Sequence, residues 1–190
     1  MPGDRRRGAG AILLARHGET DDNLRPLRFQ GFTDTPLNDV GRQQAAELAD
    51  RVARDGIVSV WSSDLARARE TAEVVGRRVG HEPRLDPRLR EGYRGRWEGR
   101  LSVDVAHDEP VRFAAWQRAG ERFRFPCGES LREQLQRVSA AVDDIRRTGE
   151  LPALVICHGG SIRVMLSERD PGGLQAFHSF RVPNVGVVAL

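Results

Sequence analysis

The chain has 190 residues, which is enough for one sizeable hydrophobic core and short for two. Hydrophobic residues make up 39% of it and charged residues 30%, a composition typical of a globular protein and unlike that of a disordered chain. The net charge is only +3, and acidic residues alternate with the arginines that supply all 30 basic side chains. A nucleic-acid-binding protein usually gathers its positive charge on one face, so we expect no nucleic-acid partner.

The start of the chain is polar and basic. Three consecutive arginines lie within the first ten residues, so we expect a disordered basic segment at 1–10, followed by a single domain at 11–190. The apolar run 11–15 is too short for a signal-peptide core or a membrane span. The two cysteines, Cys127 and Cys157, do not make a disulfide framework in a chain of this length. We therefore expect a cytoplasmic protein with no membrane partner.

The first half of the chain alternates between strands and helices. The short apolar run 11–15 is typical of a buried strand. A helix is predicted to begin at Asn38, and the apolar run 57–61 predicts the next strand. Ser62 or Ser63 is expected to cap a second helix. The apolar faces of the two helices comprise Ala45, Leu48, Ala49 and Val52 in the first and Leu65, Ala68, Ala72, Val75 and Val79 in the second.

The second half begins with a less regular stretch at 92–126, which we interpret as an insertion into the fold. A third helix is predicted after Gly128, followed by a buried strand at 153–157 and a last strand within 185–190. The apolar face of the third helix comprises Leu131, Leu135, Val138, Val142 and Ile145. This succession predicts an α/β protein, a three-layer sandwich in which helices flank a mainly parallel sheet.

Polar residues follow three of the predicted strands. Arg16 and His17 come directly after the first strand, and Arg67 lies at the start of the helix that follows the second. His158 and Gly159 come directly after the third. In open α/β sheets, ligands bind outside the carboxyl ends of the strands. The sequence therefore predicts that the three groups meet at one ligand site.

Arginine and histidine together suit a phosphate ester for physical reasons. A phosphate monoester dianion needs several fixed cations, and the planar guanidinium of arginine can bind two phosphate oxygens at once. Histidine is largely neutral at pH 7, so it can attack phosphorus without a separate base to deprotonate it. Glycines after each histidine let backbone N–H groups approach the ligand, and a helix N-terminus adds positive potential. The predicted site therefore favours a phosphorylated ligand.

Five groups of residues form motifs in a fixed order along the chain. They are Leu14–Thr20 with Asn23, Gln30, Gly31 and Asp34; Ser62–Ala68 with Thr71; Leu89–Glu91 with Gly95 and Trp97–Gly99; Phe125–Pro126 with Gly128–Ser130; and His158–Gly160. Together they resemble the motifs of the histidine phosphatase superfamily, also called phosphoglycerate mutase-like. The resemblance covers about 13–184, nearly the whole chain. It implies an α/β sandwich with an irregular insertion that covers the substrate, which agrees with the succession of predicted elements.

The resemblance also implies a role for each residue of the predicted site. His17 would be the nucleophile and would carry the phosphoryl group. Arg16, Arg67 and His158 would hold the phosphoryl oxygens and stabilise the charge of the transition state. Glu91 would protonate the leaving oxygen and then activate water for dephosphorylation.

Further substrate contacts are implied around this catalytic group. Asn23 and the backbone of Gly159 would add hydrogen-bond donors, and Gln30 and Gly31 would also contact the substrate. No metal ion and no other cofactor is implied, because the arginines do the work that Mg²⁺ does in other phosphoryl-transfer enzymes. The implied partner is a small phosphate monoester.

The chain departs from the motifs of the family in two places. The segment 23–30 is a residue longer than in many relatives, and Asp22 stands where an aromatic residue is common. Arg94 lies where mutase relatives tend to carry tyrosine. Together with Arg90 it places positive charge beside Glu91, which lowers the pKa expected for that carboxyl and weakens it as an acid, unless the two arginine side chains point away.

Other side chains suggest rival sites. Cys157 and Arg163 have the cysteine-x5-arginine spacing of cysteine phosphatases, in which the thiolate would be the nucleophile and the arginine the phosphate clamp. That spacing arises often by chance, and a small buried residue at the end of a strand is the ordinary interpretation of such a cysteine. His81, Glu82 and His107 lack the spacing of metal ligands, so we expect them at the surface.

The expected function is therefore hydrolysis of a small phosphorylated metabolite through a phosphohistidine intermediate. Two alternatives remain open: phosphoryl transfer of the phosphoglycerate mutase type, and binding of a phospho-ligand without turnover. A mutase must exclude water, and only 66 residues, 92–157, separate Glu91 from His158, which leaves a modest lid. Against this, the insertion holds several arginines that could bind a second phosphate: Arg112, Arg118, Arg122 and Arg124. The sequence leaves the oligomeric state open, a homodimer included.

Overall fold

The computed structural model describes residues 10–118 and 120–190. The basic segment predicted at 1–10 lies outside these residues except for Gly10. A five-stranded sheet with the strand order β3-β2-β4-β1-β5 forms the centre of the fold. β4 pairs in parallel with β1 and β2, and β2 with β3, whereas β5 pairs antiparallel with β1. The strands are β1 (Ile12–Arg16), β2 (Ser59–Ser62), β3 (Arg84–Leu85), β4 (Ala153–Cys157) and β5 (Val187–Ala189).

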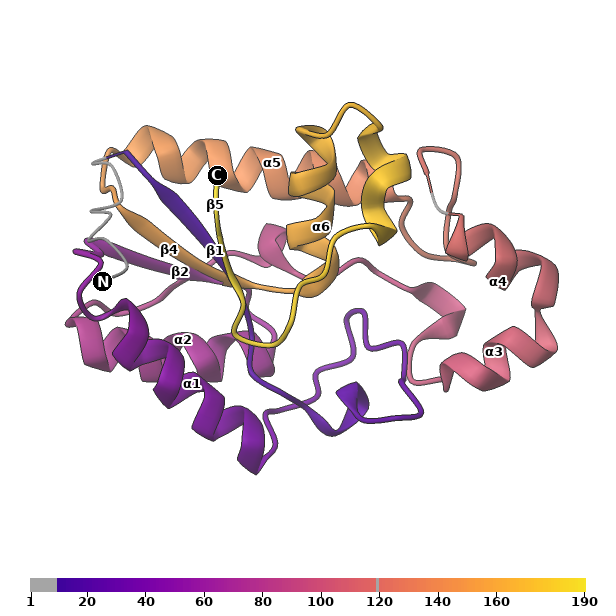
Figure 1. Cartoon of the computed structure of the whole chain (residues 1–190), viewed down its shortest axis with the longest axis horizontal. Coiled ribbons are helices and arrows are strands. Elements are labelled where there is room, and N and C mark those ends of the chain that lie inside the picture. The colour runs from indigo at the N-terminus through magenta and orange to yellow at the C-terminus, as the bar shows by residue number, and fades with distance from the viewer. Residues whose placement is uncertain (1–9, 119) are drawn as a thin grey trace, which may run out of the picture.

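Helices cover both faces of the sheet and complete the predicted three-layer sandwich (Figure 1). α1 (Asp39–Val52) and α2 (Ala66–Val79) pack on one face, and α5 (Leu131–Thr148) and α6 (Gly159–Glu168) on the other. Side chains of β1 alternate between the two layers, because successive residues of a strand point to opposite faces. Leu13 and Ala15 join the core under α1 and α2, whereas Ile12 and Leu14 join the core under α5 and α6.

The helix starts confirm two of the predictions and correct a third. Asn38 caps α1 by accepting a hydrogen bond from the backbone N–H of Gly41 at 2.8 Å. α5 begins after Ser130, which forms a capping box with a glutamate of the first turn. The predicted serine cap of α2 is wrong: β2 runs to Ser62, and α2 begins only at Ala66. The carboxylate of Asp34, from a distant loop, accepts from the Ala66 N–H at 2.6 Å instead.

The less regular stretch 92–126 lies beyond one end of the sheet, where it carries α3 (Ser102–Asp108) and α4 (Pro110–Gln117) (Figure 1). Its core is aromatic: Trp97 is fully buried, and Phe113 and Phe125 pack against its ring. Short 3-10 helices complete the fold at Asp21–Asn23, Pro87–Leu89, Gly95–Trp97 and Gly173–His178. No helix within 10–118 or 120–190 is long and apolar enough to cross a membrane.

Candidate active site

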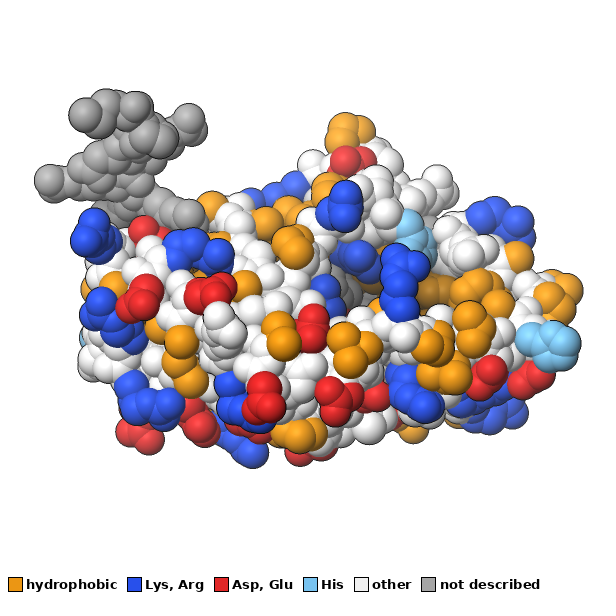
Figure 2. Space-filling model, turned by 60° about the horizontal axis from the view of Figure 1, so that its bottom comes forward, with side chains coloured by type: hydrophobic (Ala, Val, Ile, Leu, Met, Phe, Trp, Pro, Cys, Tyr) orange, Lys and Arg blue, Asp and Glu red, His pale blue; other side chains and the backbone are white. Residues whose placement is uncertain are grey.

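A cavity of about 310 Å³ opens at the carboxyl ends of β1 and β4. Figure 2 shows a hollow in this face of the molecule, with arginine side chains at its mouth and hydrophobic side chains on the side of the insertion. Residues of all three predicted polar groups line the cavity or lie directly behind its wall. The residues that line it are Arg16, His17, Asp22, Asn23, Leu27, Arg28, Phe29, Gln30, Gly31, Arg67, Glu91, Arg94, Trp116, Gly159, Gly160, Arg163, Phe177 and Asn184.

The ring of His17 is held in one orientation. Its Nδ1 lies 2.6 Å from the carbonyl oxygen of Gly18. Since a carbonyl only accepts, Nδ1 carries the proton, and Nε2 keeps the lone pair that a nucleophile needs. Burial, together with the charges of Arg67 and Arg16, holds the pKa of His17 well below the usual range of histidine. The imidazole is therefore neutral at physiological pH.

Two arginines place fixed positive charge next to this ring. The fully buried Arg67 donates from its two terminal nitrogens to the carbonyl oxygens of Thr33 at 2.8 Å and Gly31 at 2.9 Å. Arg16 donates from one terminal nitrogen to the carbonyl oxygen of Val182 at 2.8 Å. Burial lowers the pKa of Arg67 to about 10, which still leaves the guanidinium charged at neutral pH. Backbone carbonyls thus orient both guanidinium groups without neutralising them.

His158 lies against His17, with the two ring centroids 5.1 Å apart. Both of its ring nitrogens are buried and have no hydrogen-bond partner among the described residues. The same is true of the Nε atoms of Arg16 and Arg67. Buried polar groups are normally hydrogen-bonded, so such a convergence of unpaired nitrogens around one ring indicates a site made for an anionic ligand. Burial and the neighbouring charge of Arg67 also lower the pKa of His158.

The carboxylate of Glu91 lies across the cavity and accepts several hydrogen bonds. Its Oε2 accepts from the Gly160 N–H at 2.9 Å, and its Oε1 accepts from the Gly92 N–H at 2.8 Å and from Nε2 of Gln134 at 2.9 Å. A guanidinium nitrogen of Arg94 lies 3.2 Å from Oε1. Burial alone would raise the pKa of Glu91, but the charge of Arg94 and these hydrogen bonds outweigh it and lower the pKa to about 2.

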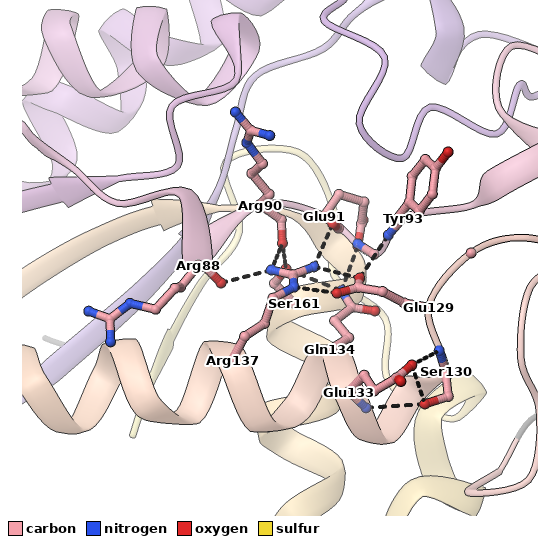
Figure 3. Close-up of polar contacts among 12 residues, drawn as sticks. Arg88, Arg90, Glu91, Tyr93, Glu129, Ser130, Glu133, Gln134, Arg137 and Ser161 are labelled. Carbon is pink, nitrogen blue, oxygen red and sulfur yellow. Dashed lines mark hydrogen bonds and ion pairs between the residues drawn. The ribbon is translucent and has the colours of Figure 1, made fainter.

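The two arginines expected beside Glu91 behave differently. Arg90 turns away from the carboxylate (Figure 3) and pairs with Asp64, with 2.7 Å between its Nε and the nearer carboxylate oxygen. Arg94 points toward Glu91, and the two side chains are only 8% and 15% exposed. The predicted lowering of the pKa therefore comes from Arg94.

Arg137 of α5 is a residue that the sequence did not single out. Its guanidinium donates to the backbone carbonyls of Arg88, Arg90 and Glu91 at 2.7, 2.6 and 2.7 Å (Figure 3). It also pairs with Glu129 at 2.6 Å. This arginine therefore fixes the backbone that presents Glu91. Its position beside Val138, on the border of the apolar helix face, was the only sequence signal for a buried role.

The remaining predicted contacts line the same cavity and support its walls. The amide oxygen of Asn23 accepts from the Thr20 N–H at 3.1 Å and from Nδ2 of Asn184 at 3.2 Å, which leaves the amide nitrogen of Asn23 as its donor. Gln30 donates to the Thr20 hydroxyl at 2.6 Å. Gly31 has a φ of +54°, favoured only by glycine, and its carbonyl orients a buried arginine. Asn184 was missed, because an asparagine in a C-terminal loop carries no recognisable pattern.

The structure argues against the cysteine mechanism. Cys157 is fully buried in the core between the sheet and α5, and burial raises the pKa of its thiol to about 12. Arg163 does reach the cavity, where its Nε donates to the Phe180 carbonyl at 3.0 Å. Within 10–118 and 120–190, no group of three or more histidine, cysteine, aspartate or glutamate residues is placed to hold a metal ion.

The chain matches the model of the histidine phosphatase superfamily (branch 1) over residues 12–190. A probable phosphoglycerate mutase GpmB from Erwinia tasmaniensis is 37% identical over 161 residues, which cover 82% of this chain and 73% of that protein. Bacillus stearothermophilus YhfR superposes with a TM-score of 0.86 at 29% identity, over 94% of this chain and 89% of the other. A mycobacterial glucosyl-3-phosphoglycerate phosphatase in complex with VO3 superposes with a TM-score of 0.85 at 28% identity, over 94% and 90% of the two chains.

The fold, the order of the motifs and these matches agree. The chain belongs to the histidine phosphatase superfamily, branch 1. Its relatives include proteins named as phosphoglycerate mutases, and its structural neighbours include a phosphatase.

Proposed function

We propose that this protein hydrolyses a small phosphate monoester through a phosphohistidine on His17, without a metal ion or other cofactor. The observation that carries the proposal is the convergence of buried, unpaired nitrogens of Arg16, Arg67 and His158 around the His17 ring. A phosphoryl group supplies the oxygens that these donors lack. Because the donors are held by backbone carbonyls or by burial, they need little reorganisation when charge develops on the phosphoryl oxygens.

In the first half of the reaction, Nε2 of His17 attacks phosphorus. The P–N bond forms, the P–O bond to the leaving group breaks, and its electron pair stays on the leaving oxygen. The Gly18 carbonyl accepts from the Nδ1 proton throughout and stabilises the positive charge that the ring gains. In this proposal Arg16, Arg67 and His158 stabilise the phosphoryl oxygens.

In the second half, water attacks the phosphohistidine, and the P–N electron pair returns to Nε2. Glu91 suits the role of general base, because its low pKa keeps it ionised and ready to accept a proton from that water. Its other implied role, protonation of the leaving oxygen, is less favoured by the same environment. The negative charge of a bound phosphate monoester raises the pKa of a nearby carboxyl, but the N–H donors in contact with Glu91 oppose that rise.

We further propose that 11–190 forms one functional domain in which 92–126 makes one wall of the substrate site. Arg94 and Trp116 of that stretch line the cavity opposite the strand ends. Leu27 and Phe29 lie on the same wall, because backbone hydrogen bonds join their loop to the insertion. Aromatic and aliphatic groups on this wall fit the carbon skeleton of a phosphorylated metabolite.

Mutase activity is the second candidate, since curated relatives are named as phosphoglycerate mutases. The positions of the arginines that were expected to bind a second phosphate argue against mutase activity. Arg112 and Arg124 are exposed and pair with Glu109 and with Glu133 of α5, respectively. They line another hollow together with Arg118 and Arg122, and none of the four lines the cavity of His17.

The test follows both reactions in one sample. The protein is incubated with 3-phosphoglycerate, with and without catalytic 2,3-bisphosphoglycerate, and with p-nitrophenyl phosphate. We expect phosphate release from p-nitrophenyl phosphate and no isomer interconversion that outruns phosphate release. Interconversion far ahead of phosphate release would establish a mutase. An absence of turnover with every phosphate monoester tried would favour a protein that only binds a phospho-ligand.

A further inference from the structure

Among the described residues, the carboxylate of Glu91 contacts N–H donors and no hydrogen-bond acceptor. A protonated carboxyl group carries an O–H that needs an acceptor, whereas a carboxylate only accepts. Each of the four groups in hydrogen-bond or ion-pair contact with this carboxylate is an N–H donor, so the whole arrangement stabilises the ionised form. The donors are the backbone N–H groups of Gly92 and Gly160, Nε2 of Gln134 and the guanidinium of Arg94.

Arg94 is fixed where it acts on this carboxylate. Its guanidinium carbon lies 4.5 Å from the ring centroid of Phe125 and 5.4 Å from that of Trp116. Its side chain is only 8% exposed, and its own backbone N–H donates to Glu98 at 3.1 Å. A charge held against aromatic faces and away from water acts more strongly on a neighbouring charge than one at the surface.

The backbone on the far side of the carboxylate fits it equally closely. A Cβ atom at Gly160 would collide with Oε1 of Glu91 and would crowd the guanidinium of Arg94. Only glycine lets the N–H at the start of α6 approach Oε2. The absence of a side chain at Gly160 therefore leaves the space that the ion pair of Glu91 and Arg94 occupies.

We propose that Arg94 is a positioning residue that holds Glu91 as a carboxylate and so restricts efficient turnover to phosphate monoesters whose leaving oxygen is stable as an anion, such as esters of phenols and enols. The inference rests on the proposed function. In the first step the leaving oxygen departs with the P–O electron pair and takes its proton from water afterwards. In the second step Glu91 accepts one proton of the attacking water, while the other remains on the phosphate released, and Glu91 then loses its proton to solvent and is again a carboxylate.

The experiment compares kcat/KM across a series of phenyl phosphates with increasingly basic phenols, together with one alkyl phosphate. The wild-type protein should lose activity steeply as the leaving group becomes more basic. Arg94→Met frees Glu91 to be protonated, so the ratio of the best to the poorest substrate should fall by ~10–100-fold, part of the ~10²–10⁴-fold that general acid catalysis contributes. Because the ratio is measured within one preparation, partial unfolding of the variant does not change it.

Two variants serve as matched controls. Arg94→Lys keeps a positive charge beside Glu91 and should keep the steep dependence. Arg90→Met removes the other arginine of the same loop, which pairs with Asp64 and does not contact Glu91, and should also keep it. A flattened dependence in either control would show that loss of local packing, and not loss of the charge, changes the ratio.

A second measurement separates this inference from the proposed function. With p-nitrophenyl phosphate, Glu91→Gln should release a burst of nitrophenol and accumulate phosphohistidine, because only the water step loses its base. Equal dependence on the leaving group in the wild-type protein and in Arg94→Met, with phosphohistidine still formed, would overturn the role of Arg94 alone. An absence of phosphohistidine in every protein would overturn the proposed function itself.

Discussion

The floor and the wall of the cavity are built in opposite ways. The floor consists of residues at strand ends and the start of α2, including Arg16, His17 and Arg67, whose side chains are fixed by burial and by bonds to backbone carbonyls. The wall, defined as every other part of the cavity lining, combines Trp116 of the insertion with Phe177, Arg163 and parts of loops. The floor has one geometry that suits phosphate, whereas the wall has the mixed chemistry that tells one carbon skeleton from another. If the proposed function holds, reaction type and substrate choice therefore depend on different parts of the chain.

The largest effect on rate should come from the floor. We expect Arg67→Gln to lower kcat/KM by ~10²–10³-fold for every phosphate monoester, the usual cost of removing one fixed donor to a transition state. The matched control is Arg69→Gln on the same helix, which removes only a partly exposed arginine 3.8 Å from Glu73. Steady-state kinetics with two unrelated substrates measures both. A loss for one substrate only would mean that Arg67 belongs functionally to the wall.

A smaller and more selective effect should come from the wall. Among the described residues, five arginines and two carboxylates line the cavity, so a bound phosphate dianion leaves net positive charge there. We expect Arg163→Ala to raise KM about tenfold, with kcat unchanged, for a substrate that carries a second anionic group, and to leave phenyl phosphate unaffected. Arg122→Ala, outside this cavity, is the control. An equal rise in KM for both substrates would remove the distinction between floor and wall.

His17 should be protonated only at a lower pH than an ordinary histidine. Burial and two arginines lower the pKa of His17, so its ring should remain neutral as the pH falls through the usual range of histidine. Protonation that removes the nucleophile then occurs only in more acidic solution. An NMR titration of the ring carbons, assigned with the variant His17→Gln, measures this directly. A midpoint at or above the usual value would contradict the electrostatic account of the floor.

The smallest effect on kcat should come from substituting Cys157, the rival nucleophile, and from removing metal ions. Cys157→Ala and treatment with EDTA should each leave kcat nearly unchanged, because the thiol is buried in the core and the arginines supply the positive charge. Phosphate release from p-nitrophenyl phosphate is the assay, and circular dichroism checks that the variant is folded. A folded variant without turnover would restore the cysteine mechanism.

Some features of the candidate site could be predicted from the sequence, and others could not. Strand ends such as Arg16-His17 were predictable, because a short apolar run fixes where a strand ends and which residues follow it. Sequence spacing could not tell Arg90 from Arg94, since both lie within three residues of Glu91. Their difference depends on Asp64, which only the folded chain brings beside Arg90.

Other features were missed for a similar physical reason. The cap of α2 is supplied by Asp34 across a loop, and the backbone beneath Glu91 is held by Arg137 from α5. Such contacts join residues that are far apart in the chain, so local spacing could not predict which partners meet. The strands and helices that were predicted occur in the predicted order, because periodicity and turn residues are local properties, whereas β3, α3, α4 and α6 were not predicted.

The most direct test of the account is to trap the intermediate. The protein is mixed with p-nitrophenyl phosphate, quenched within the first turnover and digested in base, and the modified peptide is identified by mass spectrometry. We predict a phosphoryl group on His17 that survives base and is lost in acid, and that is absent from the variant His17→Ala. A phosphoester that is stable in acid, or full labelling of His17→Ala, would contradict the mechanism.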